Sequence, residues 1–189
     1  EDMMKKIFIL SLLIICFLLT GCKEDESKFE HYDLKGKDLN TYIYYSDERG
    51  KEVYVLADIT PSGRESCLTG LFYKVAENDY ILLETLEYNQ MESYNKDYVY
   101  QFYENKLYGV GNGDSPMVFE IELKGLESKM KKIEYKVDDK INPFLITMIK
   151  HIDNKEILYY GHATIDGINS SALINCSTSK YECTITNSN

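Results

Sequence analysis

The sequence of 189 residues contains no tryptophan, three prolines, three histidines and only two arginines, Arg49 and Arg64. Because arginine is the side chain that grips phosphates and carboxylates with two parallel hydrogen bonds, a clustered site of that kind is hard to build here. The histidines, His31, His151 and His162, are not spaced as metal ligands. No nucleophile elbow, His-Glu-x-x-His motif or glycine-rich phosphate loop occurs either. We therefore expect no metal, no cofactor and no nucleophilic catalysis.

The chain is acidic, with a formal net charge of −10 at pH 7. An acidic surface is repelled by the phosphates of nucleic acids and by anionic lipid headgroups. We therefore expect no nucleic-acid partner. For the same reason, attachment to a membrane would require an anchor, because surface charge does not provide it.

The sequence predicts such a membrane-directing segment at the N-terminus, where Lys5 and Lys6 precede an apolar run of 13 residues, Ile7–Leu19. A helix of that length spans about 20 Å, against roughly 30 Å for the hydrocarbon core of a bilayer. The run is therefore short for a transmembrane helix and typical of a secretory signal peptide.

The signal ends in Leu19-Thr20-Gly21-Cys22. This motif resembles the lipobox of bacterial lipoproteins, in which an aliphatic and two small residues precede the cysteine. The resemblance implies a signal peptide over residues 1–21 and lipidation of Cys22 with acyl chains such as palmitate. It also implies a protein anchored on the extracytoplasmic face of the cell membrane. The alternative is an uncleaved N-terminal anchor with a chance cysteine.

The mature chain is predicted to consist of a polar tether over residues 22–39 and one domain over residues 40–189. Its hydrophobic pattern is that of β-strands: Phe119–Leu123 and Ile133–Val137 alternate apolar and polar residues. Helical periodicity is scarce. The best helix candidate is Asn142–Lys150, with a capping residue and a proline at its start, although its β-branched content favours a strand.

Three similar units follow one another, beginning near Tyr42, Tyr98 and Phe144, at intervals of 56 and 46 residues. Each contains four predicted strands, a pattern that resembles the repeats of β-propellers. The Trp-Asp, kelch and Asp-box motifs of known propeller repeats are absent, and a closed propeller has about four to eight blades. We predict an all-β fold of three four-stranded antiparallel meanders, either a partial propeller or a β-sandwich or barrel.

The last unit contains Cys176 and Cys183 on the same face of a predicted hairpin. Facing residues of antiparallel strands have Cβ atoms about 4.5–5.5 Å apart, close to what a disulfide requires. Outside the cytoplasm such a bond persists, and we predict a Cys176–Cys183 disulfide. The alternative is that both are small buried residues left as free thiols.

The 17 tyrosines are the other notable feature of the composition. Those near strand ends offer rigid contact area for a peptide or glycan, although tyrosine also fills the cores of β-proteins. The candidate ligand-binding residues are Tyr45, Tyr73, Tyr103, Tyr108 and Tyr160.

Together these features indicate a non-enzymatic binding or assembly module. Its expected partners are the membrane, through the lipid, and a protein or glycan at the cell surface, with self-association a further option. The alternative is a propeller-type glycosidase, for which any two well-placed carboxylates would serve.

Overall fold

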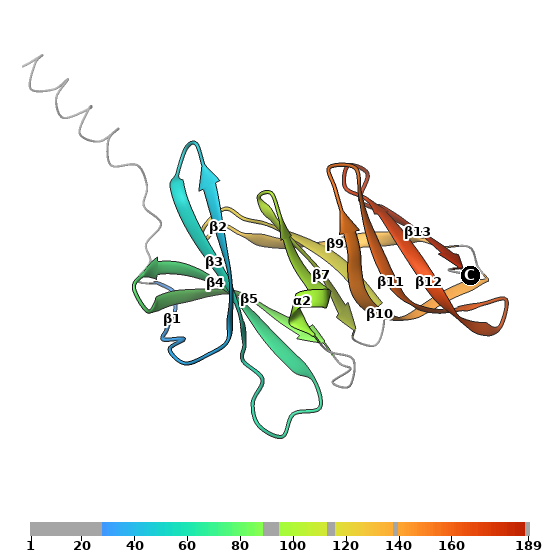
Figure 1. Ribbon diagram of the computed structural model, residues 1–189, viewed down its shortest axis with the longest axis horizontal. Coiled ribbons are helices and arrows are strands. Elements are labelled where there is room, and N and C mark those ends of the chain that lie inside the picture. Colours follow the sequence, from blue (N-terminus) through green and yellow to red (C-terminus); the bar gives the residue numbers. More distant parts are fainter. Residues whose placement is uncertain (1–27, 89–94, 113–115, 138–139, 188–189) are drawn as a thin grey trace, which may run out of the picture. The chain divides into compact units, whose positions relative to one another are not determined.

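The computed structural model describes residues 28–88, 95–112, 116–137 and 140–187. The chain divides into two units, Glu1–Glu30 and His31–Asn189, and the second contains all the described strands (Figure 1). The all-β class is confirmed. Within the described residues, no helix is long and apolar enough to cross a membrane. The signal peptide and Cys22 lie outside the described residues.

The first sheet has five strands in the order β1-β5-β4-β3-β2. Their bounds are β1 His31–Tyr32, β2 Leu39–Ser46, β3 Gly50–Asp58, β4 Cys67–Ala76 and β5 Asp79–Tyr88. Strand β1 pairs with β5, and the side chain of Leu34 is 3% exposed. The folded unit therefore begins before residue 40 and includes part of the segment predicted as tether.

The second sheet has eight strands in the order β10-β11-β12-β13-β9-β8-β7-β6. The strands of its first half are β6 Tyr100–Tyr103, β7 Lys106–Asn112, β8 Pro116–Glu122 and β9 Lys129–Lys136. Those of its second half are β10 Ile141–Ile152, β11 Glu156–Ile165, β12 Ile168–Ser177 and β13 Glu182–Asn187. A single helical turn, α2 (Lys96–Val99), precedes β6 and is capped by the side chain of Asn95.

Each predicted unit corresponds to one run of four antiparallel strands: β2–β5, β6–β9 and β10–β13. The second and third runs join into one sheet, because β13 pairs in parallel with β9 from Glu182↔Glu134 to Thr184↔Lys136. Propeller blades are separate sheets, so this pairing departs from the propeller pattern. The described residues show neither propeller closure nor a closed barrel.

The segment considered as a helix, Asn142–Lys150, is part of strand β10. It pairs with β11 along its whole length, with three register shifts. Pro143 is tolerated because β10 is an edge strand, where a missing N–H breaks no central ladder bond.

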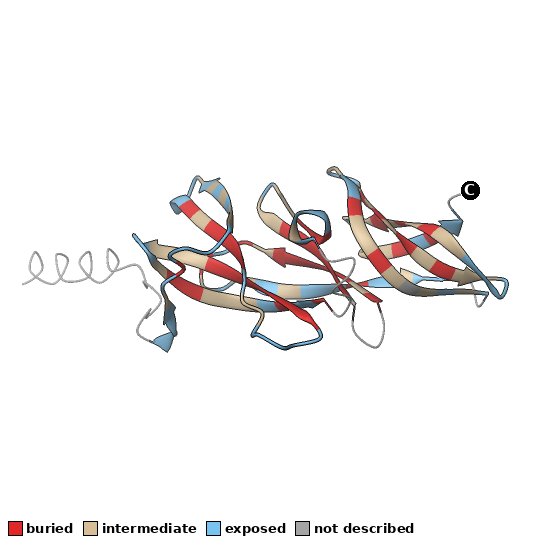
Figure 2. Ribbon diagram, turned by 60° about the horizontal axis from the view of Figure 1, so that its bottom comes forward, coloured by how far each residue is buried: buried red, intermediate tan, exposed pale blue. Residues whose placement is uncertain are grey.

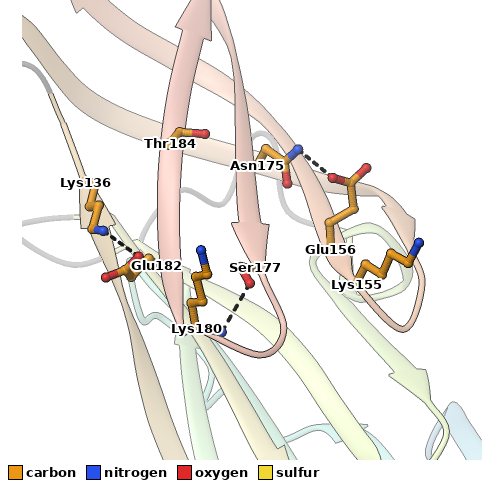
Figure 3. Close-up of a pocket in the computed structure, with 8 residues that line it drawn as sticks. All are labelled: Lys136, Lys155, Glu156, Asn175, Ser177, Lys180, Glu182 and Thr184. Carbon is orange, nitrogen blue, oxygen red and sulfur yellow. Dashed lines mark hydrogen bonds and ion pairs between the residues drawn. The ribbon is translucent and has the colours of Figure 1, made fainter.

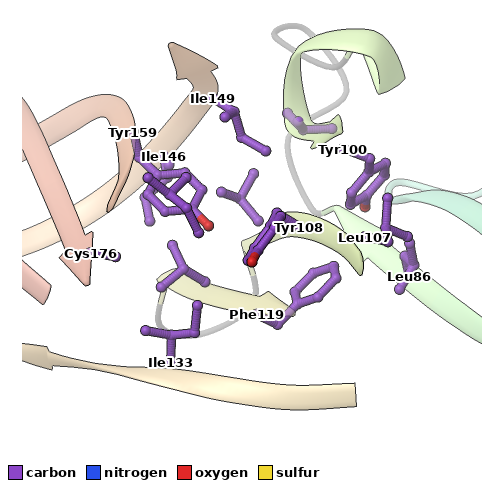
Figure 4. Packing of buried hydrophobic residues seen from close by; sticks show 14 of the residues in the cluster. Leu86, Tyr100, Leu107, Tyr108, Phe119, Ile133, Ile146, Ile149, Tyr159 and Cys176 are labelled. Atoms are coloured by element: carbon purple, nitrogen blue, oxygen red, sulfur yellow. The ribbon is translucent and has the colours of Figure 1, made fainter. Parts of the chain in front are cut away.

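The main hydrophobic core contains side chains from all three four-stranded runs, among them Leu86, Leu107, Phe119, Ile146 and Tyr159 (Figure 4). Strand β8 is buried on both faces, and Figure 2 shows buried residues alternating with half-buried and exposed ones along many of the strands. A smaller cluster, around Phe72 and Leu34, lies on the other face of the first sheet.

Polar groups inside the core are only partly paired. Glu120 on β8 is buried and accepts a hydrogen bond from the ammonium group of Lys106 at 2.9 Å. Burial, the largest single effect, lowers the pKa of Lys106, but the hydrogen bond to Glu120 and the charges of Glu120, Tyr108 and Tyr181 together raise the pKa overall. The buried hydroxyl groups of Tyr135 and Tyr159 have no hydrogen-bond partner among the described residues.

Candidate functional site

The outer face of the last four-stranded run carries the candidate site. Along β11, Ile157, Tyr159 and Ala163 are buried, while Glu156 and Tyr160 point to the opposite face and are half-buried. The strict alternation of the strand produces this division.

Cross-strand register then sets the neighbours of these outward residues. Glu156 lies opposite Ser177 of β12, and Asn175 lies opposite Thr184 of β13. Thr184 in turn lies opposite Lys136 of β9. A row of polar side chains therefore crosses the sheet at the point where the second and third runs are joined.

These side chains surround an open hollow of about 400 Å³ (Figure 3). The lining residues are Lys136, Lys155, Glu156, Asn175, Ser177, Lys180, Glu182 and Thr184. None of the eight is apolar or aromatic. The hollow therefore suits a polar ligand held by charge and hydrogen bonds.

Both carboxylates of the hollow already have partners. Glu182 forms an ion pair with Lys136 at 2.5 Å, and Glu156 accepts a hydrogen bond from the Asn175 amide at 2.8 Å (Figure 3). Among the described residues, no carboxylate pairs with the ammonium groups of Lys155 and Lys180. Two positive charges thus remain uncompensated at the hollow, in a chain whose net charge is −10.

Lys155 is placed by the turn between β10 and β11. The carboxylate of Asp153 accepts hydrogen bonds from the backbone N–H groups of Lys155 (2.7 Å) and Glu156 (2.9 Å). These two bonds, with a smaller contribution from His151, lower the pKa of Asp153 below its ordinary value of 3.8. The ionised Asp153 therefore fixes the start of β11 and, with it, two residues of the hollow.

Lys180 is placed by the turn between β12 and β13. Its backbone N–H donates to the hydroxyl of Ser177 at 3.1 Å. The next residue, Tyr181, has a φ of 56°, and the ammonium of Lys131 lies 3.1 Å from the centre of its ring. The hydroxyl of Thr178 donates to the carbonyl of Asn154 at 2.9 Å, which joins this turn to the preceding one.

A disulfide lies beneath the hollow. Cys176 and Cys183 are register partners on the buried face, and the structure joins them covalently. Cys176 is the chain neighbour of Asn175 and Ser177, and Cys183 is the neighbour of Glu182 and Thr184. The bond therefore fixes four lining residues relative to one another. Cys67 is a buried free thiol, and burial raises its pKa.

The five candidate tyrosines do not form one surface. Tyr160 lies on the outer face of β11, where its hydroxyl donates to Ser171 at 3.0 Å. Tyr45 is exposed on β2, in the other sheet. The hydroxyl of Tyr103 donates to Asn154 at 2.6 Å, next to the turn that carries Lys155.

The other two tyrosines belong to the packing of the protein. Tyr73 packs against Tyr54, with ring centres 5.4 Å apart. Tyr108 is buried in the core, and burial raises its pKa to about 12. Of the five, Tyr160 alone shares a face with the hollow.

The lysines of the hollow were not identified from the sequence. Lys155 and Lys180 stand beside predicted turns, where a lysine is ordinary surface chemistry. Their proximity depends on the pairing of β11 with β12, which sets Glu156 opposite Ser177, and on the bond from Thr178 to Asn154 between the two turns. Among the described residues, no group of three or more His, Cys, Asp or Glu is placed to hold a metal ion. Comparison with protein-family models, curated proteins and solved structures gave no match.

Proposed function

We propose that this protein is a lipid-anchored, non-enzymatic binding module on the extracytoplasmic face of the cell membrane, and that the hollow binds an anionic ligand. The observation that carries the proposal is the pair of ammonium groups of Lys155 and Lys180, which pair with no carboxylate in the part of the chain that the structure describes, beside carboxylates that already have partners. The lining amide and hydroxyl groups add hydrogen-bonding capacity on paired strands, which are rigid supports for a binding site.

An acidic glycan fits this chemistry better than a protein. A specific protein interface buries about 800 Å² on each partner and has an apolar or aromatic centre. The hollow is small, and none of its lining residues is apolar. A sugar that bears carboxylates would meet lysines, an amide and hydroxyl groups, each able to pair with it.

The test uses the purified protein with oligosaccharides of uronic acids and with neutral oligosaccharides of equal length. Titration calorimetry should show binding of the acidic set only, weakened at least tenfold by Lys155→Ala with Lys180→Ala. Binding should weaken as salt is raised, because exposed charges are screened. Lys51→Ala, on the first sheet, is the matched control and should change nothing. Equal binding of neutral sugars, or equal loss with the control, would contradict the assignment of the ligand.

The anchor is a separate part of the proposal and rests on Leu19-Thr20-Gly21-Cys22. Expression of the full chain followed by membrane fractionation should find the parent with the membranes and a lipid mass on Cys22. The Cys22→Ser variant should be released or remain unprocessed. Unchanged fractionation, with no lipid on Cys22, would show that the lipobox assignment is wrong.

One observation favours a second candidate function, glycoside hydrolysis by paired carboxylates. Glu156 and Glu182 line the same hollow, and two carboxylates across a sugar-binding site are what such enzymes use. The test is a screen of chromogenic glycosides with the parent, Glu156→Gln and Glu182→Gln. Turnover that either substitution abolishes, with the fold intact, would replace the binding-module proposal by an enzymatic one.

The propeller-like arrangement also stays a proposal. The three consecutive four-stranded runs support it, whereas the parallel pairing of β13 with β9 joins two of the runs into one sheet and favours a different architecture.

A further inference from the structure

The outer face of the last four-stranded run continues from the hollow toward Tyr160. Glu156 and Tyr160 both point outward from β11, and four residues of an extended strand span about 13 Å. Between them on the same face lie two half-buried leucines, Leu158 of β11 and Leu173 of β12. Leu158 is the register partner of Asn175, which lines the hollow, and Leu173 is the register partner of Tyr160. The face therefore passes from a polar hollow over an aliphatic step to an aromatic ring.

Two register shifts in β10 flank Tyr160. Met148 is the register partner of Tyr160, and the pairing skips Thr147 before this position and Lys150 after it. A β-bulge inserts an extra residue into one strand and redirects its side chains, and bulges are over-represented beside active sites. Here the hydroxyl of Thr147 donates to the backbone carbonyl of Tyr160 at 3.2 Å, and the ammonium of Lys150 lies 5.0 Å from the centre of the Tyr160 ring. Strand β10 thus brings a third lysine to the face that carries the hollow.

The ring of Tyr160 is held in a defined position. Its hydroxyl donates to Ser171 of β12 at 3.0 Å. The ring of His162, the next outward residue of β11, meets it edge-on, with ring centres 6.0 Å apart. A ligand would therefore contact a side chain that is already ordered, which lowers the entropic cost of binding.

The part of the chain that forms this face is not acidic, although the whole protein is. Residues 129–189 include eight lysines and seven acidic residues, a net charge of +1, so residues 1–128 carry −11. Among the described residues, no carboxylate pairs with Lys150. The nearest acidic residue along the chain is Asp153, which is bonded to backbone N–H groups of its own turn and to His151. The other described carboxylates lie farther away: Glu156 four residues along β11, Asp166 at a hairpin tip beside Lys140, and Glu134 and Glu182 at least three strands from β10.

We propose that this face is a second subsite for the acidic glycan, where Lys150 pairs with a carboxylate and the ring of Tyr160 contacts the sugar. Leu158 and Leu173 contact the C–H groups of the sugar units that lie between this subsite and the hollow. The inference rests on the proposed function of the hollow and extends it. The ligand is an oligosaccharide that bears carboxylates on separated units, because a single acidic sugar does not reach from the hollow to Lys150.

The first test titrates uronic acid oligosaccharides, from the monosaccharide to the hexasaccharide, into the full chain purified in detergent. Calorimetry should show that the affinity of the parent rises at least tenfold over this series. In the double variant Lys150→Ala, Tyr160→Leu, the monosaccharide should bind as it does to the parent, and most of the rise should be lost. The remainder is the statistical gain of a longer chain, which has more ways to occupy the hollow.

The matched control for the first test is Lys129→Ala. Lys129 is exposed at the start of β9 and belongs to the opposite face of the same sheet, so its loss removes an equal charge and should leave the series unchanged. Circular dichroism checks the folding of each variant. Lys150→Ala alone changes one exposed side chain, and it keeps the test decisive if the double variant does not fold.

The second test asks whether Lys150 recognises a carboxylate. It compares a hexasaccharide with a carboxylate on every unit and a neutral hexasaccharide that ends in one uronic acid. Lys150→Ala should weaken the first about fivefold, as expected for an exposed ion pair. It should leave the second unchanged, because the single carboxylate occupies the hollow with its two lysines.

Three results would overturn the second subsite and leave the hollow as a binding site. They are a length dependence in the double variant equal to that of the parent, an equal loss with Lys129→Ala, and an equal effect of Lys150→Ala on the two hexasaccharides. Absence of binding at every length would overturn the proposed function of the hollow together with this extension of it.

Discussion

The hydroxyl of Tyr54 accepts a hydrogen bond from the backbone N–H of Gly125, 71 residues further along the chain, at 2.8 Å. The same hydroxyl donates to the carboxylate of Glu52, which is buried and also forms an ion pair with Arg49 at 3.1 Å. Burial, together with the bond to Glu52, raises the pKa of Tyr54 well above its ordinary value of 10.0. Because Tyr54 lies on β3 and Gly125 follows β8, this network links the first sheet to the second.

The first prediction concerns this network. Tyr54→Phe should lower the free energy of unfolding by about 2–3 kcal/mol, because it leaves a buried carboxylate and a buried N–H without their common partner. Tyr159→Phe is the matched control, since its buried hydroxyl has no partner among the described residues. Tyr159→Phe should leave the free energy of unfolding unchanged or raise it by about 1 kcal/mol. Urea unfolding of both variants measures the difference, and equal effects would contradict the assigned roles.

A second prediction follows from the close approach of β10 to β11. A Cβ atom on Gly161 would lie 2.1 Å from the carbonyl oxygen of Leu145 and 2.9 Å from Cα of Ile146. Both are backbone atoms, so no side-chain rotation relieves the clash. Gly161→Ala should destabilise the fold by about 3 kcal/mol.

The control for that substitution is Gly167→Ala in the hairpin between β11 and β12. Gly167 has a φ of +80°, and no atom lies within 4 Å of the place that a Cβ would occupy, so the cost of alanine there comes from backbone strain alone. The expected cost is about 1 kcal/mol. Thermal unfolding monitored by circular dichroism compares the two, and a larger loss for Gly167→Ala would show that the approach of β10 does not constrain Gly161.

Local pattern was sufficient to predict the strands from β2 onward and their grouping in fours, because alternation and turn residues are properties of short segments. Strand β1, which was expected to be part of the tether, was missed. The pairing of β9 with β13 was not predicted, since residues such as Tyr135 and Cys183 carry no sequence signal that they are neighbours. The burial of Tyr108 was missed for a related reason. It depends on other strands covering both faces of the second run, which hydropathy along one strand does not reveal.

The candidate site was beyond prediction for the same physical reason. Lys155 and Lys180 come from two turns, and Lys136 comes from a strand of another four-stranded run. What makes them a site is their placement around one hollow, in which Glu156 is already bonded to Asn175 and Glu182 to Lys136. Neither is a property of residue type or spacing.

The third prediction concerns the Cys176–Cys183 bond. A disulfide that closes a loop this short restricts the unfolded chain modestly, and its loss should lower the free energy of unfolding by about 2 kcal/mol. Replacing both cysteines by alanine should also weaken binding at the hollow, because the bond fixes the strands that carry Asn175 and Thr184. Peptide mapping without reduction checks the pairing in the parent. Free thiols at both positions, or a bond to Cys67, would contradict it.

The last prediction concerns the stability of the fold at low pH. The pKa of Asp153 is lowered in the folded protein, mainly by hydrogen bonds from the backbone N–H groups of Lys155 and Glu156. A group whose folded pKa is depressed stabilises the fold above its unfolded pKa, and that contribution is lost as the pH falls through the folded value. The contribution of Asp153 should therefore be fully present at pH 6 and disappear below its ordinary pKa of 3.8.

Asp153→Asn measures this directly, because it removes the charge and retains an acceptor oxygen. The urea midpoint of the variant should lie below that of the parent at pH 6, and the two should converge as the pH is lowered toward 2. The variant should also bind ligand at the hollow more weakly than the parent at pH 6, and this difference should shrink toward pH 2, since Asp153 positions both Lys155 and Glu156. The matched control is Asp166→Asn, in the next hairpin tip of the same sheet, where the carboxylate lies 3.8 Å from Lys140 and is 67% exposed. A difference between parent and Asp153→Asn that stays constant from pH 6 to pH 2 would show that the charge of Asp153 does not stabilise the turn.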